Sequence, residues 1–433
     1  MKGVSFRKGG WNMNASLVIN GNQICRLIQR TLNHVDPRLV DHGVRVAFMM
    51  GKLCKAEGGY TEKELQDLSM VALFHDIGAY KTEEIDEMIS FETDNIWKHS
   101  VYGYLFLKKL SPLTQYAEIL LYHHVHCADF SYYKTDMQPM AELLFLSDRV
   151  DIYLRSRKDL NHLEQYLKKQ TGTLFSKRAV DLFLSVSEQI VNQIDQITFE
   201  DVVSHPYFTD EEVDQYLKML TFAIDFRSEH TVTHTITTTQ ISYETAKIMG
   251  VREPELTKVF YGAMLHDLGK IAIPVEILEF PGKLSPQAMA IMKTHVELTA
   301  VILDHDVDAE TIAMAIRHHE RLDGSGYPNA LLAKELTLSE RIIAVSDVVS
   351  ALLGTRSYKE SFSTEKSLQI ISTQAKQGKL DQHVVDAIVN HIDDILDVVY
   401  RKCEHILKTY QGINQEYREL LQYFEEKEAS FRV

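Results

Sequence analysis

The sequence predicts an all-α protein made of two tandem helical domains. Glycine and proline are scarce, at 20 and 9 of 433 residues, so few helix breaks are expected. Apolar residues recur at helical spacing through most of the chain. An ordered pattern of histidine and aspartate residues occurs twice, once in each half, and such an internal repeat indicates duplicated units.

Helical spacing starts near Leu17, after a first dozen residues that we expect to form a loose arm. The clearest helix start is Thr61, an N-cap type of residue followed three positions later by Glu64. This pair is typical of a capping box. Helical apolar residues continue from there to His75-Asp76, and Gly78 is expected to end that helix.

The second half repeats this plan. A helix is expected to open at Glu253-Pro254 and to run into His266-Asp267. The flanking residues also agree, since Ala-Leu-Phe precedes His75 and Ala-Met-Leu precedes His266. Each His-Asp pair belongs to a set of five histidines and two aspartates. The two sets are His42, His75, Asp76, His99, His123, His124 and Asp148, and His234, His266, Asp267, His295, His318, His319 and Asp347.

The spacing within the two sets is similar. Successive groups are separated by 33, 24, 24 and 24 residues in the first set and by 32, 29, 23 and 28 in the second. Together the sets hold ten of the 19 histidines of the chain. Chance placement would not produce this order twice, so both sets are candidate metal ligands.

We expect one domain in residues 1–200 and a second in residues 201–433, with a linker around residues 198–210. Helical apolar stripes continue from Ser363 to the C-terminus, and residues 416–428 form a charged helix with Leu420, Leu421 and Phe424 on one face. Packing into the core is the simpler interpretation of these stripes. The alternative is a homodimer through the C-terminal helices.

The net charge of -15 argues against DNA or RNA as a partner, because such proteins need a basic face to displace counterions. The four cysteines are far apart and suggest free thiols in a reducing compartment. The sequence shows no secretory signal and no apolar run of the roughly 20 residues that a membrane helix needs. We therefore expect a cytoplasmic protein that does not contact a membrane.

Five imidazoles and two carboxylates suit a first-row transition metal such as iron or manganese better than calcium or structural zinc. Seven ligands exceed the need of one ion, which favours two ions that share Asp267. Two neighbouring ions suit phosphoester hydrolysis, because they can activate water, bind phosphate oxygens and stabilise the leaving oxygen. No nucleophile elbow, phosphate loop or dinucleotide glycine pattern competes with this interpretation.

Residues 225–359 resemble the HD-GYP family of HD-type metal-dependent phosphohydrolases. The resemblance is carried by His266-Asp267-x-Gly-Lys270, Lys293-x-His295 and a long run from His318-His319 to Tyr327-Pro328. Ile-Ala-Val-Ser before Asp347 and Thr-Arg-Ser-Tyr-Lys at 355–359 extend it. The resemblance implies an all-helical HD fold, a non-haem iron or manganese centre, and hydrolysis of a cyclic dinucleotide, usually cyclic di-GMP, to linear pGpG or GMP.

The resemblance also implies roles for single residues. The second set would be the metal ligands, with Asp267 bridging the ions, and Lys270 would lie beside a substrate phosphate. Arg356, Lys359 and Tyr327 would contact the substrate. The alternatives are a cation that matches a helix C-terminus for Lys270, and a solvated charged face for Arg356 and Lys359.

The glycines and the proline of residues 323–328 predict a turn. The resemblance implies that this Gly-Tyr-Pro loop shapes substrate access or docks a protein partner. The alternative is an ordinary surface turn. Some members of the family bind a third ion through a glutamate four positions before the first histidine. That position is His230 here, with Glu229 just before it, and His230 could reach the cluster as a ligand of a third metal, because residues four apart share a helix face.

The first half resembles a degenerate HD domain. All seven ligand positions are filled, yet Ala79 replaces the lysine and no Gly-Tyr-Pro loop follows His123-His124. Lys81 lies nearby and could substitute for the lysine. We expect a metal-bearing domain that is weakly active, substrate-sensing or structural.

The resulting hypothesis is a cyclic dinucleotide phosphodiesterase with cyclic di-GMP as substrate and cyclic GMP-AMP as the alternative. A non-catalytic cyclic-dinucleotide sensor or docking module is the second hypothesis. A phosphohydrolase of the HD superfamily that acts on mononucleotides is the third, and the Gly-Tyr-Pro loop weighs against it.

Overall fold

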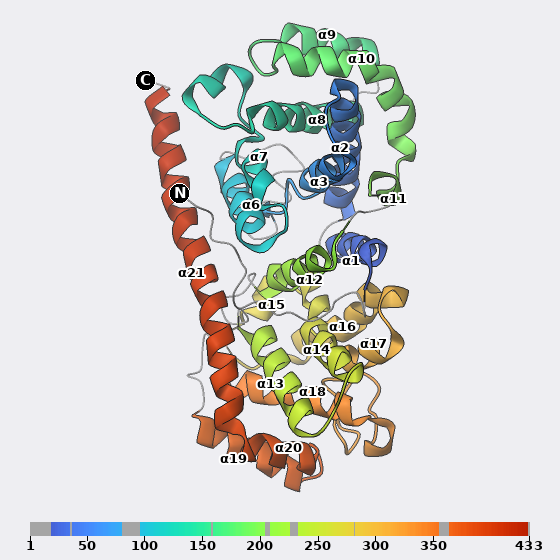
Figure 1. The fold of residues 1–433 in the computed structure, drawn as a ribbon, viewed down its shortest axis with the longest axis vertical. Helices are drawn as coiled ribbons and strands as arrows, with labels where there is room; N and C mark the ends of the chain where they lie inside the picture. Colours follow the sequence, from blue (N-terminus) through green and yellow to red (C-terminus); the bar gives the residue numbers. More distant parts are fainter. Residues whose placement is uncertain are drawn as a thin grey trace. The chain divides into compact units, whose positions relative to one another are not determined.

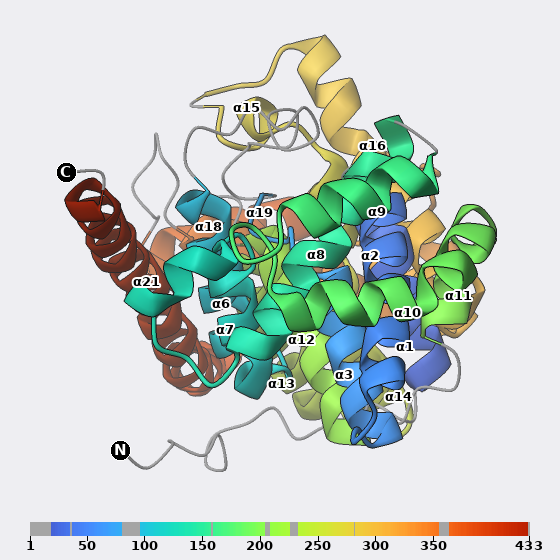
Figure 2. The same cartoon turned by 90° about the horizontal axis from the view of Figure 1, so that it is seen from above.

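The computed structural model describes residues 19–34, 37–79, 96–156, 159–203, 208–225, 233–280, 282–354 and 363–431. These residues form helices joined by short turns (Figures 1 and 2). Among them there is no β-strand, only two isolated bridges, Thr171 with Phe175 and Asp323 with Leu332. The predicted all-α class is confirmed.

The chain divides into two compact units. The N-terminal unit comprises residues 25–207, 222–232 and 405–433, and the C-terminal unit comprises residues 1–24, 208–221 and 233–404. The last part of the chain thus belongs to the N-terminal unit. Whether residues 1–200 and 201–433 are separate domains stays a prediction.

In the N-terminal unit, helix α2 packs against α3, α8 and α10, and α6 packs against α7. Met49, Leu68 and Val71 are among the buried side chains of this core, and burial of each such side chain stabilises the fold by roughly 1.5–3 kcal/mol. The helices are α1 (Gly21–Asn33), whose first turn falls in the other unit, α2 (Pro37–Glu57), α3 (Glu62–Leu73), α6 (Trp97–Leu110), α7 (Ala117–Tyr122), α8 (Gln138–Ser156), α9 (Leu160–Lys169), α10 (Lys177–Gln193) and α11 (Phe199–Val202).

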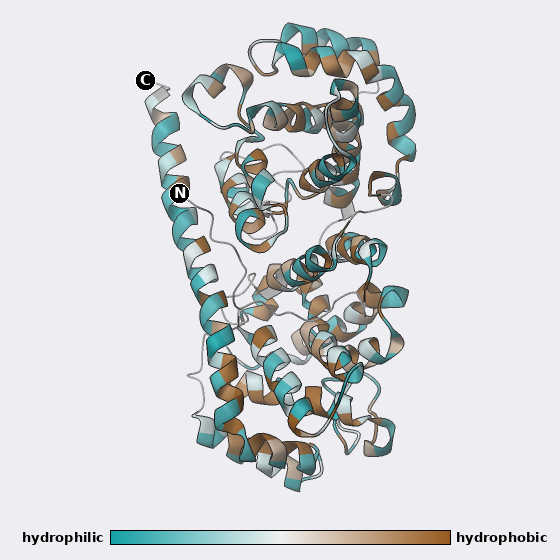
Figure 3. Cartoon of the chain, viewed as in Figure 1, coloured by the Kyte–Doolittle hydropathy of each residue, from teal (hydrophilic) through white to brown (hydrophobic). Residues whose placement is uncertain are grey.

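In the C-terminal unit, α13 packs against α14 and α18, and α14 packs against α17. Hydrophobic and hydrophilic residues alternate along these helices (Figure 3), and Ile241, Val259 and Ile343 are among the buried side chains. The helices are α12 (Asp210–Asp225), whose last turn falls in the other unit, α13 (His234–Ile248), α14 (Glu255–Leu265), α15 (Val275–Leu278), α16 (Pro286–Leu303), α17 (Ala309–Ile316), α18 (Leu338–Leu353), α19 (Thr364–Lys376) and α20 (Gln382–Asn390). The last helix, α21 (Ile392–Phe431), continues from this unit into the N-terminal one.

Both predicted helix starts are confirmed. Thr61 caps α3 with a full capping box to Glu64, and α14 follows Pro254. The expected helix end at Gly78 is wrong, because α3 ends at Leu73 and a series of turns carries His75 and Asp76. Gly78 instead lies against α6, where a Cβ atom would collide with the carbonyl oxygen of His99.

The apolar stripes of the C-terminal helices pack into the core, as the simpler interpretation predicted. Ile371, Val384 and Ile395 are buried. Further along α21, Phe424 is 2% exposed and stacks on Trp97 of α6, with ring centroids 4.0 Å apart. A homodimer through these helices stays a prediction. No helix within the described ranges has the length and apolar character to cross a bilayer.

Candidate metal centres

The seven predicted ligands of the second half lie together in the C-terminal unit, and we call this group the second centre. His234 begins α13, His295 lies in α16 and Asp347 lies in α18. The pairs His266-Asp267 and His318-His319 directly follow α14 and α17. Six of them form two groups of donor atoms, one of His234, His266 and Asp267 and the other of His295, His318 and His319. The seventh, Asp347, has its Oδ1 atom 3.2 Å from Nε2 of His234.

Asp267 faces both groups of the second centre. Its Oδ2 atom is 3.4 Å from Nε2 of His234 and 3.2 Å from Nε2 of His266. Its Oδ1 atom is 3.4 Å from Nε2 of His295 and 3.9 Å from Nε2 of His318. A carboxylate in this position can give one oxygen to each of two ions.

The imidazole tautomers are set by the backbone. The Nδ1–H groups of His266, His295 and His318 donate to the carbonyl oxygens three residues earlier, at 2.6, 2.5 and 2.6 Å. The Nε2 lone pair of each ring then faces the centre, as metal coordination requires. In each case the carbonyl belongs to the helical turn just before the histidine, so this turn also fixes the orientation of the ring.

Electrostatics keep most of these ligands ready to bind a cation. Burial lowers the pKa of His295 to about 4 and that of His319 to about 3, so both rings are neutral. Burial alone would raise the pKa of Asp267, but its electrostatic interactions with His266 and with the ammonium group of Lys270 hold it well below its usual range. Burial likewise lowers the pKa of His234, yet its hydrogen bonds with Asp267 and Asp347 outweigh burial and raise it to about 9.

Lys270 and the Gly-Tyr-Pro loop lie beside the second centre. The Nζ atom of Lys270 is 2.5 Å from Oδ2 of Asp267, and 17% of the lysine side chain is exposed. The ring of Tyr327 lies against His319, with centroids 4.6 Å apart, and Nζ of Lys293 lies 4.7 Å from the Tyr327 ring centroid. Burial raises the pKa of Tyr327, so its phenol stays protonated.

Glu320 holds this loop in place. Glu320 is buried, with 1% of the residue exposed. Its carboxylate accepts hydrogen bonds from the backbone N–H groups of Asn329 at 2.7 Å and Leu331 at 2.9 Å. Gly324 has a φ of 78°, as the turn prediction required. At Gly326 a Cβ atom would collide with the backbone of Glu320 and Arg321, so the loop can close over its own start only with glycine there.

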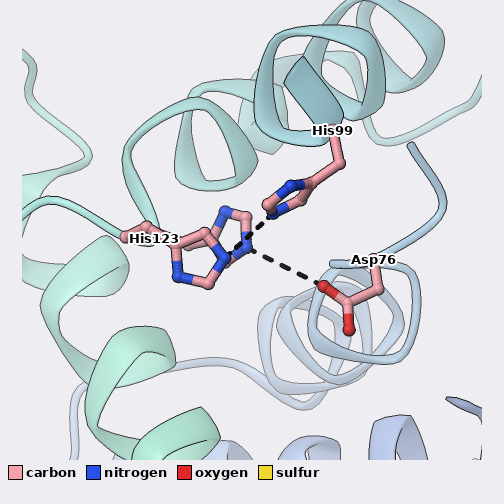
Figure 4. A group of neighbouring side chains, drawn as sticks. Asp76, His99 and His123 are labelled. Atoms are coloured by element: carbon pink, nitrogen blue, oxygen red, sulfur yellow. Dashed lines mark hydrogen bonds and ion pairs between the residues drawn. The ribbon is translucent and has the colours of Figure 1, made fainter. Parts of the chain in front are cut away.

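The seven predicted ligands of the first half also come together, and we call them the first centre. Asp76, His99, His123 and His124 form one group, and His42, His75 and Asp148 form the other. Figure 4 shows Asp76, His99 and His123 pointing toward one another from separate segments of the chain. Asp76 again lies between the groups, with Oδ2 3.3 Å from Nε2 of His75 and Oδ1 4.0 Å from Nε2 of His123.

The two centres differ in the residue that contacts Nδ1 of their first histidine, which is His234 in the second centre and His42 in the first. Nδ1 of His234 lies 3.0 Å from the hydroxyl of Ser350. Nδ1 of His42 lies 2.7 Å from Oδ2 of Asp151, and Arg45 pairs with both oxygens of that carboxylate at 2.5 and 3.0 Å. Burial lowers the pKa of His42, but Asp148 and Asp151 outweigh it and raise the pKa to about 10.

The donor sets of both centres fit metal ions. Donors that each lie about 2.1 Å from one ion are about 3.0–3.4 Å apart, which is close to the Asp267 and Asp76 distances. Among the described residues, Nε2 of His75, Nε2 of His123, Oδ2 of Asp148 and Oδ1 of Asp267 are buried without a hydrogen-bond partner. Buried polar atoms normally have a partner, and these four point to where an ion would be bound.

Comparison with known proteins agrees with this arrangement. Residues 39–153 and 218–384 each match an HD domain family. The chain has two HD domains, as the resemblance predicted. Each HD domain contains all seven ligands of one centre, so the resemblance inferred from the sequence is confirmed. HD domains depend on metal, and the two centres are their candidate metal sites.

Two curated relatives of this chain are bacterial. It is 28% identical over 419 residues to 3′3′-cGAMP-specific phosphodiesterase 1 of Vibrio cholerae, covering 90% of this chain and 94% of the relative. It is 36% identical over 184 residues to the cyclic di-GMP phosphodiesterase response regulator RpfG of Xanthomonas campestris, covering 42% of this chain and 48% of the relative. The chain thus spans about half of the second protein.

A solved structure supports the fold. The match to the crystal structure of a cyclic GMP-AMP specific phosphodiesterase of V. cholerae covers 87% of this chain and 98% of that one, with a TM-score of 0.52 and 17% sequence identity. At this identity the likeness shows the fold alone.

Three predicted site residues cannot be placed. His230, predicted for a third metal, and Arg356 and Lys359, predicted for the substrate, lie outside the described residues, as does Lys81. Sequence reasoning also missed Asp151, Arg149 and Ser350, which touch ligands of the two centres. Asp151 and Ser350 each lie three residues after a ligand aspartate, so a search one helical turn beyond each ligand would have found them.

Proposed function

We propose that the second centre hydrolyses a phosphodiester bond of a cyclic dinucleotide with two divalent metal ions, iron or manganese. The observation that carries this proposal is Asp267, whose two oxygens face two separate groups of histidines. The ions would be held by His234, His266, Asp267, His295, His318, His319 and Asp347. When bound, they supply Lewis acid chemistry and lower the pKa of water.

The side chains of this chain would orient the phosphate and offset its charge. Lys270 would contact a non-bridging phosphate oxygen, because its ammonium group lies next to the carboxylate between the two groups. Tyr327 would border the substrate, because its ring lies on His319 and its phenol stays protonated. In the reaction water adds across one P–O bond, phosphorus gains a hydroxyl group and the leaving ribose oxygen gains a proton.

Two substrates remain as candidates, each supported by a different relative. A protein that matches across 90% of this chain is named a 3′3′-cGAMP-specific phosphodiesterase, which supports cyclic GMP-AMP. RpfG, whose match covers less than half of this chain, is named a cyclic di-GMP phosphodiesterase, which supports cyclic di-GMP. One cleavage of either gives a linear dinucleotide with one phosphomonoester, and a second cleavage gives mononucleotides.

Product analysis of the metal-loaded chain with both nucleotides tests the proposal. The variant His266→Ala/Asp267→Ala should abolish cleavage, and His75→Ala/Asp76→Ala should retain a measurable part of it. Binding of either nucleotide without any product would instead support the non-catalytic sensor. If the first-half variant alone abolished turnover, catalysis would belong to the first centre and the proposal would be wrong.

A further inference from the structure

An arginine lies at the first centre next to two of its ligands. Arg149 follows Asp148 in α8, and its Nε atom is 3.5 Å from Oδ2 of Asp148. Its Nη2 atom is 3.5 Å from Nδ1 of His124. The guanidinium also lies over the Phe145 ring, 5.3 Å from the centroid, and 31% of the side chain is exposed. A positive charge therefore stands at the edge of the first centre within reach of solvent.

The second centre carries its cation at a different position. There Lys270 lies against Asp267, whereas the first centre has the buried Ala79 at the matching place, three residues after its own aspartate. The residue after Asp347 is Val348, which has no charge and matches Arg149. Among the described residues, Lys270 contacts a ligand carboxylate in the second centre and Arg149 does so in the first, and the two come from different parts of the HD domain.

The contact between Arg149 and Asp148 is longer than that between Arg45 and Asp151 in the same unit. Arg45, in the same unit, pairs with both oxygens of Asp151 at 2.5 and 3.0 Å. Arg149 is 3.5 Å from Asp148, which is longer than the usual 2.7–2.9 Å of a charge-assisted hydrogen bond. Asp148 also faces His42 at 3.3 Å and is a candidate metal ligand, so its charge is shared among several cations.

A metal-loaded first centre would carry excess positive charge. Two divalent ions outweigh the two carboxylates of Asp76 and Asp148, and the guanidinium of Arg149 adds to that excess. Like charges repel strongly in a half-buried site. An anion that contacts the ions and the guanidinium together would remove this repulsion, and the planar donor fork of arginine matches the oxygens of a phosphate.

We infer that the first centre binds a phosphoryl group, with Arg149 as the anion-binding side chain that takes the role of Lys270. The ligand class is a phosphate ester, either the monoester of a nucleotide or the diester of a cyclic dinucleotide. The inference rests on the prediction that the first centre holds metal, and it does not depend on turnover at the second centre.

Phosphate binding by the full-length chain tests this assignment. The second centre is first disabled by His266→Ala/Asp267→Ala, the protein is loaded with Mn²⁺, and manganese content is measured. Inorganic phosphate is then titrated by calorimetry into this parent and into the same protein with Arg149→Met, Arg149→Lys or Arg155→Met. Arg155 is a matched control, because it is exposed and lies six residues further along α8. Competition by GMP and by cyclic di-GMP distinguishes a monoester from a diester.

We expect the parent and Arg155→Met to bind phosphate equally. Arg149→Met should retain manganese and bind phosphate about tenfold more weakly or worse, as for a lost hydrogen bond to a charged group, and Arg149→Lys should lie between. Equal phosphate affinity in Arg149→Met and Arg155→Met would overturn the inference. So would loss of manganese in Arg149→Met, because Arg149 would then support the metal ligands. A parent without manganese would refute the inference and the first metal site together, while leaving the product assay of the second centre intact.

Discussion

In the second centre, the ammonium group of Lys270 contacts the carboxylate of Asp267, which faces both groups of ligands. We expect Lys270→Met to lower kcat by about 10²–10³-fold, the usual effect of removing one preorganised group that stabilises developing charge, and to retain metal. The measurement is steady-state hydrolysis together with metal analysis. Lys247→Met is the matched control, since this half-exposed lysine pairs with Glu244 away from the ligands. Loss of metal with normal kcat per bound ion would contradict the role.

His234 carries a proton that metal binding must displace. Hydrogen bonds with Asp267 and Asp347 raise its pKa to about 9 despite burial, so the metal-free ring is protonated at pH 7. Protonated His234 therefore stabilises the metal-free fold at low pH, and this contribution is lost as pH rises through about 9. The affinity of the centre for metal instead rises with pH, because only the neutral ring of His234 can coordinate an ion.

We therefore expect Mn²⁺ binding at the second centre to release about one proton at pH 7 and to strengthen up to tenfold per pH unit toward pH 9. Calorimetry in buffers of different ionisation enthalpy measures the released proton. His42 shares this property at the first centre, so the titration uses the variant His75→Ala/Asp76→Ala. A binding enthalpy that does not depend on the buffer would contradict the expected protonation of His234.

At the scale of the element, the Gly-Tyr-Pro loop depends on one carboxylate. Glu320 accepts two backbone N–H groups from the far side of the loop. Glu320→Gln replaces one acceptor oxygen by an amide N–H₂ group, which cannot accept from the facing backbone N–H. The loss of a buried charged hydrogen bond costs about 1.5–3 kcal/mol, and it should loosen Tyr327 from His319.

We expect Glu320→Gln to raise KM and lower kcat while the metal content stays normal. The matched control is Glu335→Gln, because Glu335 accepts the exposed N–H of Leu332 outside the loop. Kinetics with the preferred cyclic nucleotide and metal analysis provide the measurements. Parent-like kinetics in Glu320→Gln would show that the loop position does not limit catalysis.

The elements are more predictable from the sequence than the contacts behind them. Thr61 and Glu64 define a helix start through purely local hydrogen bonds, so sequence suffices there. The predicted end of α3 is wrong because Gly78 serves a close approach to His99, a residue of another helix. Gly269 has the same contact with His295. Such a tertiary requirement leaves no local signal that distinguishes it from a helix cap.

At the scale of the whole molecule, the internal repeat is sufficient to predict both candidate centres. The order and spacing of ten histidines identify them, because each ligand lies in a helix or in the turn that follows one, and the two units repeat that plan. The path of α21 cannot be predicted in this way. Its apolar stripe is the same whether it packs on its own unit, on the other unit or on a second chain. Tertiary contacts distinguish these, among them Phe424 with Trp97, Tyr417 with Tyr102 and Glu416 with Lys109.

The contact of Phe424 with Trp97 gives a prediction for the chain as a whole. Trp97 begins α6, the helix that carries His99 of the first centre, and its Nε1–H donates to Glu428 at 2.8 Å while its ring stacks on Phe424. Removing a buried phenylalanine side chain typically costs 3–5 kcal/mol, so we expect Phe424→Ala to destabilise the N-terminal unit by about 3 kcal/mol. Because α6 would then be less firmly held, metal binding at the first centre should weaken while the second centre keeps its metal.

Thermal unfolding followed by tryptophan fluorescence, with metal titration of the two centres, measures this effect. Tyr400→Ala is the control, because this tyrosine lies on the same helix and is 61% exposed, so its removal should change stability by no more than about 0.5 kcal/mol. Unchanged stability and first-centre affinity in Phe424→Ala would mean that α21 contributes nothing to that unit. Equal weakening at both centres would mean that α21 acts on the chain in general rather than through α6.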